Sequence, residues 1–112
     1  MKRLGWVGQL KSDCVDKYLA LHAAPWPTVL ARITDCNLQN YSIFYKHMPG
    51  GEHLLFSYVE YTGDDFQADM QRMAADPEVQ RWWDECKPCF ERIEGLAPGE
   101  VWLTMQQVFY QP

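Results

Sequence analysis

Hydrophobic and polar residues recur along the chain with two different periods, and these periods predict both strands and helices. Four segments alternate or are rich in β-branched and aromatic residues, as is typical of strands: residues 3–10, 40–46, 54–61 and 101–110. The third of these (LLFSYVEY) has the clearest strand pattern. Residues 48–51 and 95–99 carry the glycines and prolines expected of connecting loops.

The segment between the first two predicted strands indicates a helix that is broken once. Ser12 or Asp13 can cap its beginning, and the predicted buried stripe is Val15, Leu19 and His22, with Tyr18 beside it. Proline is favoured in the first turn of a helix and disfavoured in its interior. The prolines on either side of Trp26 therefore predict a kink, followed by a second helical stretch over residues 27–35.

A second broken helix is predicted between the last two strands. Asp64 or Asp65 can cap its first part, in which Phe66, Met70, Met73 and Ala74 fall on one stripe. Asp76-Pro77 restarts the helix, and the second stripe is Val79, Trp83, Cys86 and Phe90.

The resulting order, β-α-β-β-α-β, predicts one α+β domain over residues 1–112 with a ferredoxin-like fold. In this fold a four-stranded antiparallel sheet carries its helices on one face. Both alternating sets of the third strand are apolar, with Leu54 and Phe56 on one side and Leu55 and Val59 on the other. Since the helices cover only one face, a second subunit is the simplest cover for the other, and we expect a homodimer.

Trp82 and Trp83 are adjacent on the second broken helix. Neighbours on a helix point about 100° apart, so a single core stripe does not easily bury both rings. The stripe that includes Val79 and Cys86 predicts that Trp83 faces the core and Trp82 an edge, cleft or interface. A break in this helix is expected at Cys86-Lys87-Pro88.

Composition and charge narrow the classes of function. Hydrophobic residues make up 47% of the chain and aromatic residues 14%, which indicates a packed globule. Ten Lys and Arg against fifteen Asp and Glu give a net charge of −5, without the basic cluster that nucleic-acid binding requires. Apolar runs are too short to span a membrane, and no hydrophobic segment follows the charged N-terminus. We expect a soluble cytoplasmic protein.

The cysteines do not fit a metal or redox centre well. Cys86 and Cys89 have CxxC spacing, but they follow a helix, whereas redox cysteines of this spacing normally begin one. A structural zinc would need two further ligands, and His47 and His53 lie in a predicted loop region without a second cysteine pair. We expect reduced thiols and no metal, and two separate disulfides stay an alternative for a secreted protein.

The candidate chemistry lies at the end of the first helix. Tyr18 and His22 are four residues apart and share a helical face, and Trp26 follows four residues later, where the prolines bend the chain. An imidazole can donate or accept a proton near neutral pH, and a neighbouring phenol can orient a hydroxyl group. Spacing alone also fits a histidine at the boundary of the core.

Four motifs resemble the L-rhamnose mutarotase family, and they lie in the same order along nearly the whole chain. They are Tyr18-x-x-x-His22-x-x-x-Trp26-Pro27, Asn40-Tyr41-Ser42-Ile43, Asp76-Pro77-x-x-Gln80-Arg81-Trp82-Trp83 and Val108-Phe109-Tyr110. The resemblance implies a cofactor-free homodimer of the dimeric α/β-barrel type. It also implies a mutarotase that interconverts the α and β anomers of a 6-deoxyhexose, either L-rhamnose or L-fucose.

The resemblance further implies roles for individual residues. His22 would be the proton donor, and the sugar would contact Tyr18, Tyr41, Trp82 and Trp83. Trp26 and Arg81 would flank the pocket, where Arg81 could order hydroxyl groups or form a surface salt bridge. Gln107 stands where members of the family often carry Glu, so a second acid–base group is not identified by the motifs.

Two other functions fit the same fold. One is a cofactor-independent monooxygenase that acts on an aromatic substrate in this pocket. The other is a non-catalytic dimeric module that binds a small molecule. Acceleration of sugar anomer exchange would distinguish the mutarotase from both.

Overall fold

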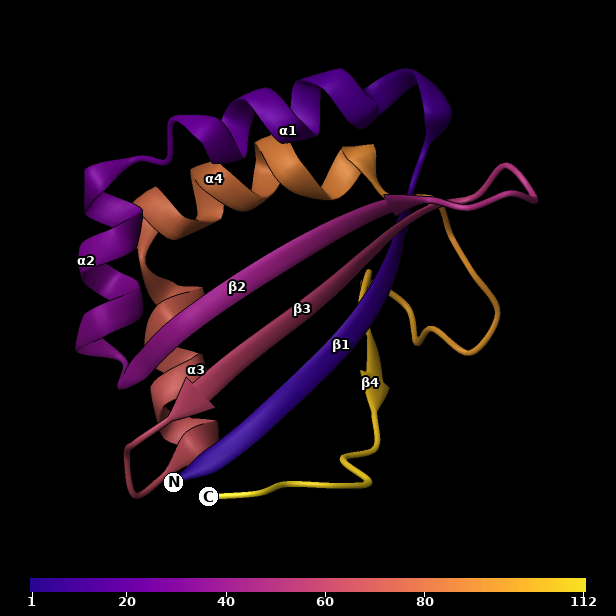
Figure 1. Cartoon of the computed structure of the whole chain (residues 1–112). Coiled ribbons are helices and arrows are strands. Elements are labelled where there is room, and N and C mark those ends of the chain that lie inside the picture. Colours follow the sequence, from indigo (N-terminus) through magenta and orange to yellow (C-terminus); the bar gives the residue numbers. More distant parts are fainter.

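Four strands pair into one antiparallel sheet in the order β2-β3-β1-β4 (Figure 1). The computed structural model describes all 112 residues. The strands are β1 (Lys2–Leu10), β2 (Leu38–His47), β3 (His53–Tyr61) and β4 (Leu103–Met105). β1 pairs with β3 and β4, and β2 pairs with β3, always in the antiparallel sense. This order and the predicted ferredoxin-like fold agree.

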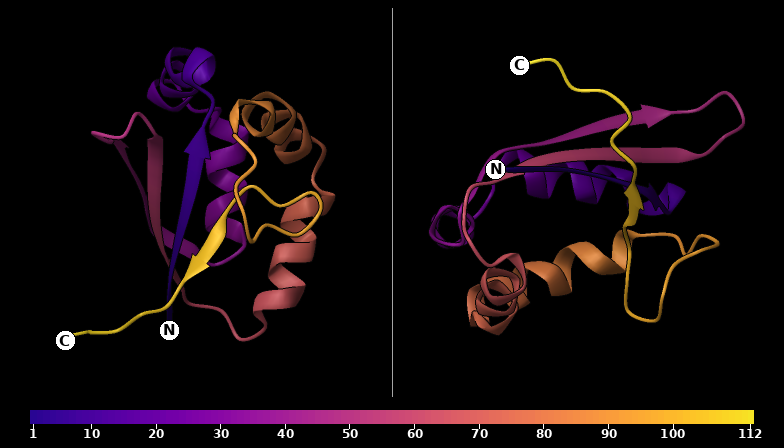
Figure 2. Two further views of the ribbon diagram at one scale, coloured as in Figure 1. Left: turned by 90° about the vertical axis from the view of Figure 1, so that its right-hand side faces the viewer. Right: turned by 90° about the horizontal axis from the view of Figure 1, so that it is seen from below.

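Both predicted helices are present, and each is broken where the sequence predicts. The first consists of α1 (Val15–Ala23) and α2 (Pro27–Asp35), and the second of α3 (Phe66–Ala75) and α4 (Pro77–Cys86). Short 3-10 turns, η1 (Ser12–Cys14) and η2 (Lys87–Cys89), precede α1 and extend α4. Proline begins both α2 and α4, where its missing N–H costs no helical hydrogen bond. All the helices lie on one side of the sheet (Figure 2).

Aspartates cap the second pair of helices. The Asp65 carboxylate accepts a hydrogen bond from the Ala68 amide, 3.1 Å away. Asp76 accepts from the amides of Glu78 and Val79 at 2.8 and 3.1 Å, and from the Arg32 guanidinium of α2 at 2.8 Å. Because these bonds favour the ionised carboxyl, with the Val79 amide contributing most, the pKa of Asp76 is lowered. Asp76, between α3 and α4, thereby joins the start of α4 to α2.

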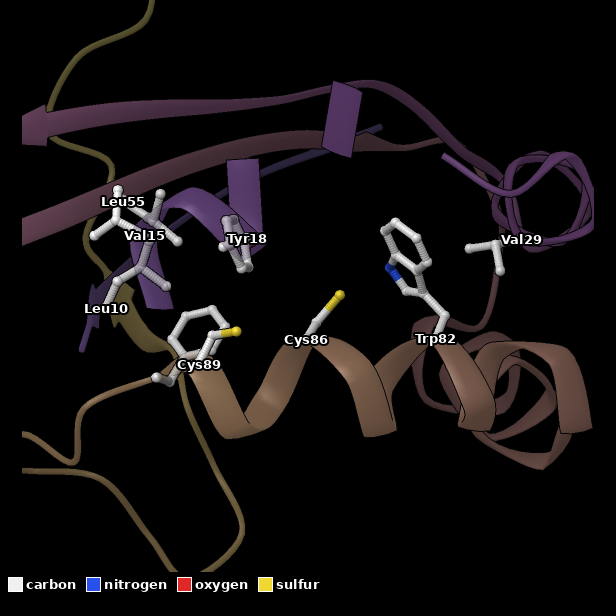
Figure 3. Close-up of a cluster of buried hydrophobic side chains, with 9 residues drawn as sticks. Leu10, Val15, Tyr18, Val29, Leu55, Trp82, Cys86 and Cys89 are labelled. Carbon is white, nitrogen blue, oxygen red and sulfur yellow. The ribbon is translucent and has the colours of Figure 1, made fainter. Parts of the chain in front are cut away.

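The core fills the space between the sheet and the helices. On β3, Leu55, Ser57, Val59 and Tyr61 face the helices and are buried. One buried cluster joins Leu10 and Leu55 of the sheet to α1 and α4, and a second joins Val59 and Tyr61 to α3 and α4. Figure 3 shows the first cluster, with side chains of α4 directed toward those of α1.

Two predictions for α1 are wrong. Residues 12–14 form a 3-10 turn, so the N-cap position falls on Cys14, and neither Ser12 nor Asp13 caps the α-helix. The predicted stripe is also only partly correct, because α1 packs toward α4: Val15 is buried, but Tyr18 is 3% exposed whereas Leu19 is 40% exposed.

The last strand is shorter than predicted. Pairing extends only from Leu103 to Met105, opposite Val7 to Gly5 of β1, and residues 106–112 leave the sheet. Val108 and Phe109 are 86% and 78% exposed, because no part of this chain covers them. Tyr110 contacts Arg3, whose guanidinium donates to the Tyr110 hydroxyl at 2.7 Å.

The sheet face opposite the helices is uncovered and carries apolar side chains. Phe44 of β2 is 64% exposed there, and Leu54, Phe56 and Tyr58 of β3 are half-buried. The C-terminal tail leaves the sheet on this side (Figure 2). None of the helices combines the length and the apolar composition that a membrane span requires.

The exposure of Leu19 on α1, compared with the full burial of Leu55 on β3, leads to a stability prediction. Leu55→Ala should lower the free energy of unfolding by about 2–5 kcal/mol, because it removes a fully buried side chain. Leu19→Ala, the same substitution at an exposed helical site, should change it by less than about 1 kcal/mol. Urea unfolding followed by circular dichroism measures both values. Similar losses for the two variants would contradict the observed face of α1.

Candidate active site

A cavity of about 800 Å³ lies between the helix-covered face of the sheet and the helices. It is mostly apolar, and a small number of polar groups from α1, β2, α4 and the segment before β4 reach it. Its volume is in the range typical of sites for small molecules. Tyr18, His22, Tyr41, Trp82 and Trp83 all line it, so the structure brings five residues from three separate motifs to one place.

Aromatic rings form a continuous wall along this cavity. The imidazole of His22 stacks on the Tyr18 ring with centroids 4.1 Å apart, and Trp82 meets His22 edge-on at 5.1 Å. Trp26 meets Trp82 at 5.2 Å, and Phe90 meets Tyr18 at 5.5 Å. Such pairs add about 0.5–1.5 kcal/mol each beyond the burial of area, so the wall also fixes the positions of its members.

His22 is held in one tautomer. Its Nδ1 lies 2.9 Å from the Tyr18 backbone carbonyl, which can only accept a hydrogen bond, so Nδ1 carries the proton. Nε2 is then the nitrogen with a free lone pair. Burial lowers the pKa of His22 below its ordinary 6.5, although the hydrogen bond to Tyr18 opposes this change. The neutral imidazole is therefore the resting form at neutral pH.

Two tyrosine hydroxyl groups also reach the cavity. Burial raises the pKa of Tyr18 well above its ordinary value, and the nearby Tyr41 adds to the effect. Burial also raises the pKa of Tyr41 to about 12, although 40% of this residue as a whole is exposed. Tyr41 lines the cavity with part of its side chain while other atoms face solvent. Both phenols stay protonated at physiological pH, as neutral hydrogen-bond donors and acceptors.

The two tryptophans take roles opposite to those that the stripe predicts. Trp82 is buried and points from α4 into the space faced by Tyr18 (Figure 3), whereas Trp83 is half-buried. The reason is that α4 packs against α1 and Trp26 as well as against the sheet, which rotates its buried face toward Trp82. Trp83 packs against both core clusters, and the Lys87 ammonium lies 4.7 Å from its ring centroid. The α-helix ends at Cys86, as predicted.

The two flanking residues differ in position. Trp26 does not line the cavity, but it supports the wall through its contact with Trp82. Arg81 lies outside: its side chain is 61% exposed and forms an ion pair with Glu78. The sequence left open whether Arg81 orders hydroxyl groups or forms a surface salt bridge, and the structure shows the salt bridge. Gln107 belongs to the exposed tail and does not line the cavity.

Several lining residues were not identified from the sequence as part of the site. Trp6 of β1, Phe90 after η2 and Trp102 before β4 extend the apolar wall, and Phe90 meets Trp102 at 5.1 Å. Lys87 and Glu100 bring charged groups to the rim. Backbone pairing of β1 with β4 and with Phe90 brings Trp6, Phe90 and Trp102 together. The alternation of residues 3–10 could have indicated only that Trp6 and Leu10 share a face.

A second cavity of about 430 Å³ adjoins the first and shares six lining residues with it: Trp83, Lys87, Phe90, Gly99, Glu100 and Val101. The loop of residues 91–100 forms its outer side. It contains none of the Tyr18, His22 and Tyr41 groups, so the larger cavity is the candidate site.

The cysteines are free, and three of them are buried. Cys86 lines the cavity, where burial raises the pKa of its thiol to about 12, so it is protonated and unreactive as a nucleophile. No group of three or more His, Cys, Asp or Glu residues is placed to hold a metal ion.

Comparisons with a family model and with individual known proteins agree with one another. The family model of L-rhamnose mutarotase matches residues 3–111. L-rhamnose mutarotases of Phocaeicola vulgatus and Oceanobacillus iheyensis are each 29% identical over 110 residues, which cover 98% of both chains. An L-fucose mutarotase of Xanthomonas campestris is 28% identical over 97% of this chain and 87% of its own.

Solved structures show the same fold. The L-rhamnose mutarotase of Formosa agariphila superposes with a TM-score of 0.74 at 23% identity, and the match covers the whole of both chains. Tetracenomycin F2 cyclase of Streptomyces glaucescens superposes over both whole chains with a TM-score of 0.66 at 13% identity. At these identities the superpositions support the fold alone.

The environment of His22 leads to a prediction for its titration. The imidazole should titrate with a midpoint below 6.5, because burial disfavours the charged form, and its neutral form should carry the proton on Nδ1. Nitrogen NMR shifts recorded against pH measure both properties, and His22→Gln identifies the signals. A midpoint above 6.5, or a neutral form protonated on Nε2, would contradict the described environment.

Proposed function

The chain belongs to the L-rhamnose mutarotase family, and from this premise and the geometry of the cavity we propose that it interconverts the α and β anomers of a 6-deoxyhexose. The single observation that carries the proposal is the meeting of His22, Tyr18, Tyr41 and Trp82 in one cavity. The enzyme would be an isomerase, because the reaction only opens and recloses the sugar ring.

We propose that His22 moves the protons. Opening the hemiacetal removes the proton from O1 and adds one to the ring oxygen, and reclosure on the other face of the carbonyl reverses both transfers. The neutral imidazole first accepts the O1 proton at Nε2, and the imidazolium formed then donates a proton to the ring oxygen. His22 thus acts as a base before it acts as the donor that the family resemblance implies, because its lowered pKa makes the neutral form the resting one.

The remaining lining groups bind and orient the sugar. The Tyr18 and Tyr41 hydroxyl groups are protonated and can hydrogen-bond sugar hydroxyl groups. The Trp82 and Trp83 rings offer apolar surface to the C–H groups and to the C6 methyl of a deoxy sugar. Relatives named for L-rhamnose and for L-fucose both match this chain, so the proposed substrate class is the 6-deoxyhexoses.

Anomer exchange is the direct test of this function. Saturation-transfer NMR should show faster exchange between the α and β anomeric protons of L-rhamnose or L-fucose when the protein is added. His22→Ala should reduce the acceleration by about a hundredfold or more, because it removes the proton carrier. Tyr18→Phe should reduce it by about five- to tenfold, the loss expected for one hydrogen bond.

Arg81→Gln is the matched control, because its ion pair lies outside the cavity, and it should stay within about twofold of the parent chain. Circular dichroism would show whether each variant is folded. If the parent chain accelerates the exchange of no 6-deoxyhexose, the proposed function is wrong. Equal losses for Arg81→Gln and Tyr18→Phe would contradict the assigned site.

We also propose that two copies associate through the uncovered face of the sheet. Phe44, Phe56 and Met105 lie on this face with no cover from their own chain, and the exposed Val108 and Phe109 continue the apolar surface along the tail. Monomeric proteins rarely expose large continuous apolar surfaces. A second copy would bury the apolar sheet face and the apolar tail at once. The free cysteines fit a reducing compartment, and we place the dimer in the cytoplasm.

Light scattering coupled to gel filtration tests the dimer. The parent chain should elute with twice its 13.1 kDa mass, and Phe44→Glu should give the monomer because it places a charge on the shared face. Leu19→Glu, at an exposed position on the helical side, should leave the dimer intact. A parent chain that stays monomeric at micromolar concentration would contradict this assembly.

A further inference from the structure

Strand β2 contains a bulge at the point where it reaches the cavity. Gln39 pairs with Glu60, and Ser42 pairs with Tyr58. Two residues of β2, Asn40 and Tyr41, therefore stand opposite the single residue Val59 of β3. A bulge of this kind changes the side of the sheet to which the following residues point.

The bulge decides where the Tyr41 side chain goes. In a regular strand Gln39 and Tyr41 would share one face, because side chains alternate with a period of two. Gln39 pairs with Glu60, and its side-chain amide donates to the Glu60 carboxylate on the uncovered face, although Gln39 also contributes to the lining of the cavity. The extra residue instead sends Tyr41 to the cavity side, where it joins Ile43 in the lining.

The backbone conformation at the bulge is an uncommon one. Asn40 has φ of +51°, in the left-handed region that most residues other than glycine avoid. Asparagine tolerates this region better than most residues, because its short amide can hydrogen-bond locally. The conformation still requires stabilising contacts to persist as the single form.

Glu60 supplies these contacts from the neighbouring strand. Its Oε1 accepts from the Asn40 side-chain amide at 2.8 Å and from the Gln39 side-chain amide at 3.0 Å. Its Oε2 accepts from the Tyr58 hydroxyl at 2.7 Å. These hydrogen bonds, that from Tyr58 most of all, lower the pKa of Glu60 to about 2, so the carboxylate persists at every physiological pH.

We infer that Glu60 is a positioning residue for the sugar site. Its carboxylate holds the Asn40 bulge on one face of the sheet, and the bulge directs the Tyr41 hydroxyl into the cavity on the other face. Glu60 does not line the cavity, whereas Gln39, Asn40 and Tyr41 do, so Glu60 acts through the bulge that carries Tyr41. The inference rests on the proposed function only for its effect on catalysis, because the placement of Tyr41 can be measured without a sugar.

A double-mutant cycle tests the route through Tyr41. In Glu60→Gln the negative charge is lost and an amide nitrogen replaces one of the two acceptor oxygens. The donors that faced that oxygen lose their acceptor, so the bulge should loosen. We expect kcat/KM for anomer exchange to fall about tenfold, mainly through a higher KM. In a Tyr41→Phe background the same substitution should change kcat/KM by less than about twofold, because the group it positions is already absent.

Glu52→Gln is the matched control, since this exposed carboxylate lies in the loop at the far end of β2 and β3, and it should leave kcat/KM unchanged. An equal effect of Glu60→Gln with and without Tyr41 would overturn the inference. So would a Glu60→Gln variant with the kinetics of the parent chain.

Phenol titration gives a second readout that needs no sugar. In the parent chain the Tyr41 phenol, identified as the ultraviolet difference from Tyr41→Phe, should titrate with a pKa of about 12. In Glu60→Gln it should titrate closer to the ordinary value of 10, because the ring is no longer held in the cavity. An unchanged titration would overturn the inference. If the parent chain accelerates no sugar exchange, the proposed function fails, and this titration still decides the role of Glu60.

Discussion

The insertion of Trp82 between His22 and Trp26 is the contact on which the rest of the site depends. It joins α4 to the end of α1 and to the bend before α2, so helices from opposite halves of the chain share one aromatic layer. The layer lies over the sheet and leaves a cavity beneath it that Tyr18 and Tyr41 reach. A large ring at this position supports the imidazole and separates it partly from water. The lowered pKa of His22 follows from the same packing, because burial disfavours the charged form.

The two breaks in the helices make this contact possible. A straight helix would carry residues 15–35 past the sheet, whereas the bend at Pro25 and Pro27 turns the chain and places Trp26 beside Trp82. The Asp76 carboxylate binds the first amides of α4 and the guanidinium of Arg32. These bonds connect the break between α3 and α4 to helix α2, which follows the first break. The proposed site therefore lies at helix ends, where side chains from several directions can converge.

The two faces of the sheet contribute differently to the site. The helix-covered face supplies the cavity lining, and the uncovered face carries the Glu60 network and the apolar surface proposed for the dimer. The bulge at Asn40 is the place where one face affects the other, because a single extra residue moves Tyr41 across the sheet. Association of two copies would also exclude water from the Glu60 hydrogen bonds, which strengthens such bonds when every donor is paired.

Local patterns in the sequence determined the strands, both helix breaks, the ferredoxin-like order and the motifs that carry Tyr18, His22, Tyr41, Trp82 and Trp83. Period, proline position and capping act within a few residues, so the sequence alone reveals them. Only the tertiary structure decided that α1 buries Tyr18 and exposes Leu19, that Trp82 is buried more deeply than Trp83, and that the last strand ends at Met105. A helix pattern defines an apolar side only to within one residue, about 100°, and the packing partner selects the orientation. The apolar residues of the tail, Val108 and Phe109, are likewise exposed because no other part of the chain packs against them.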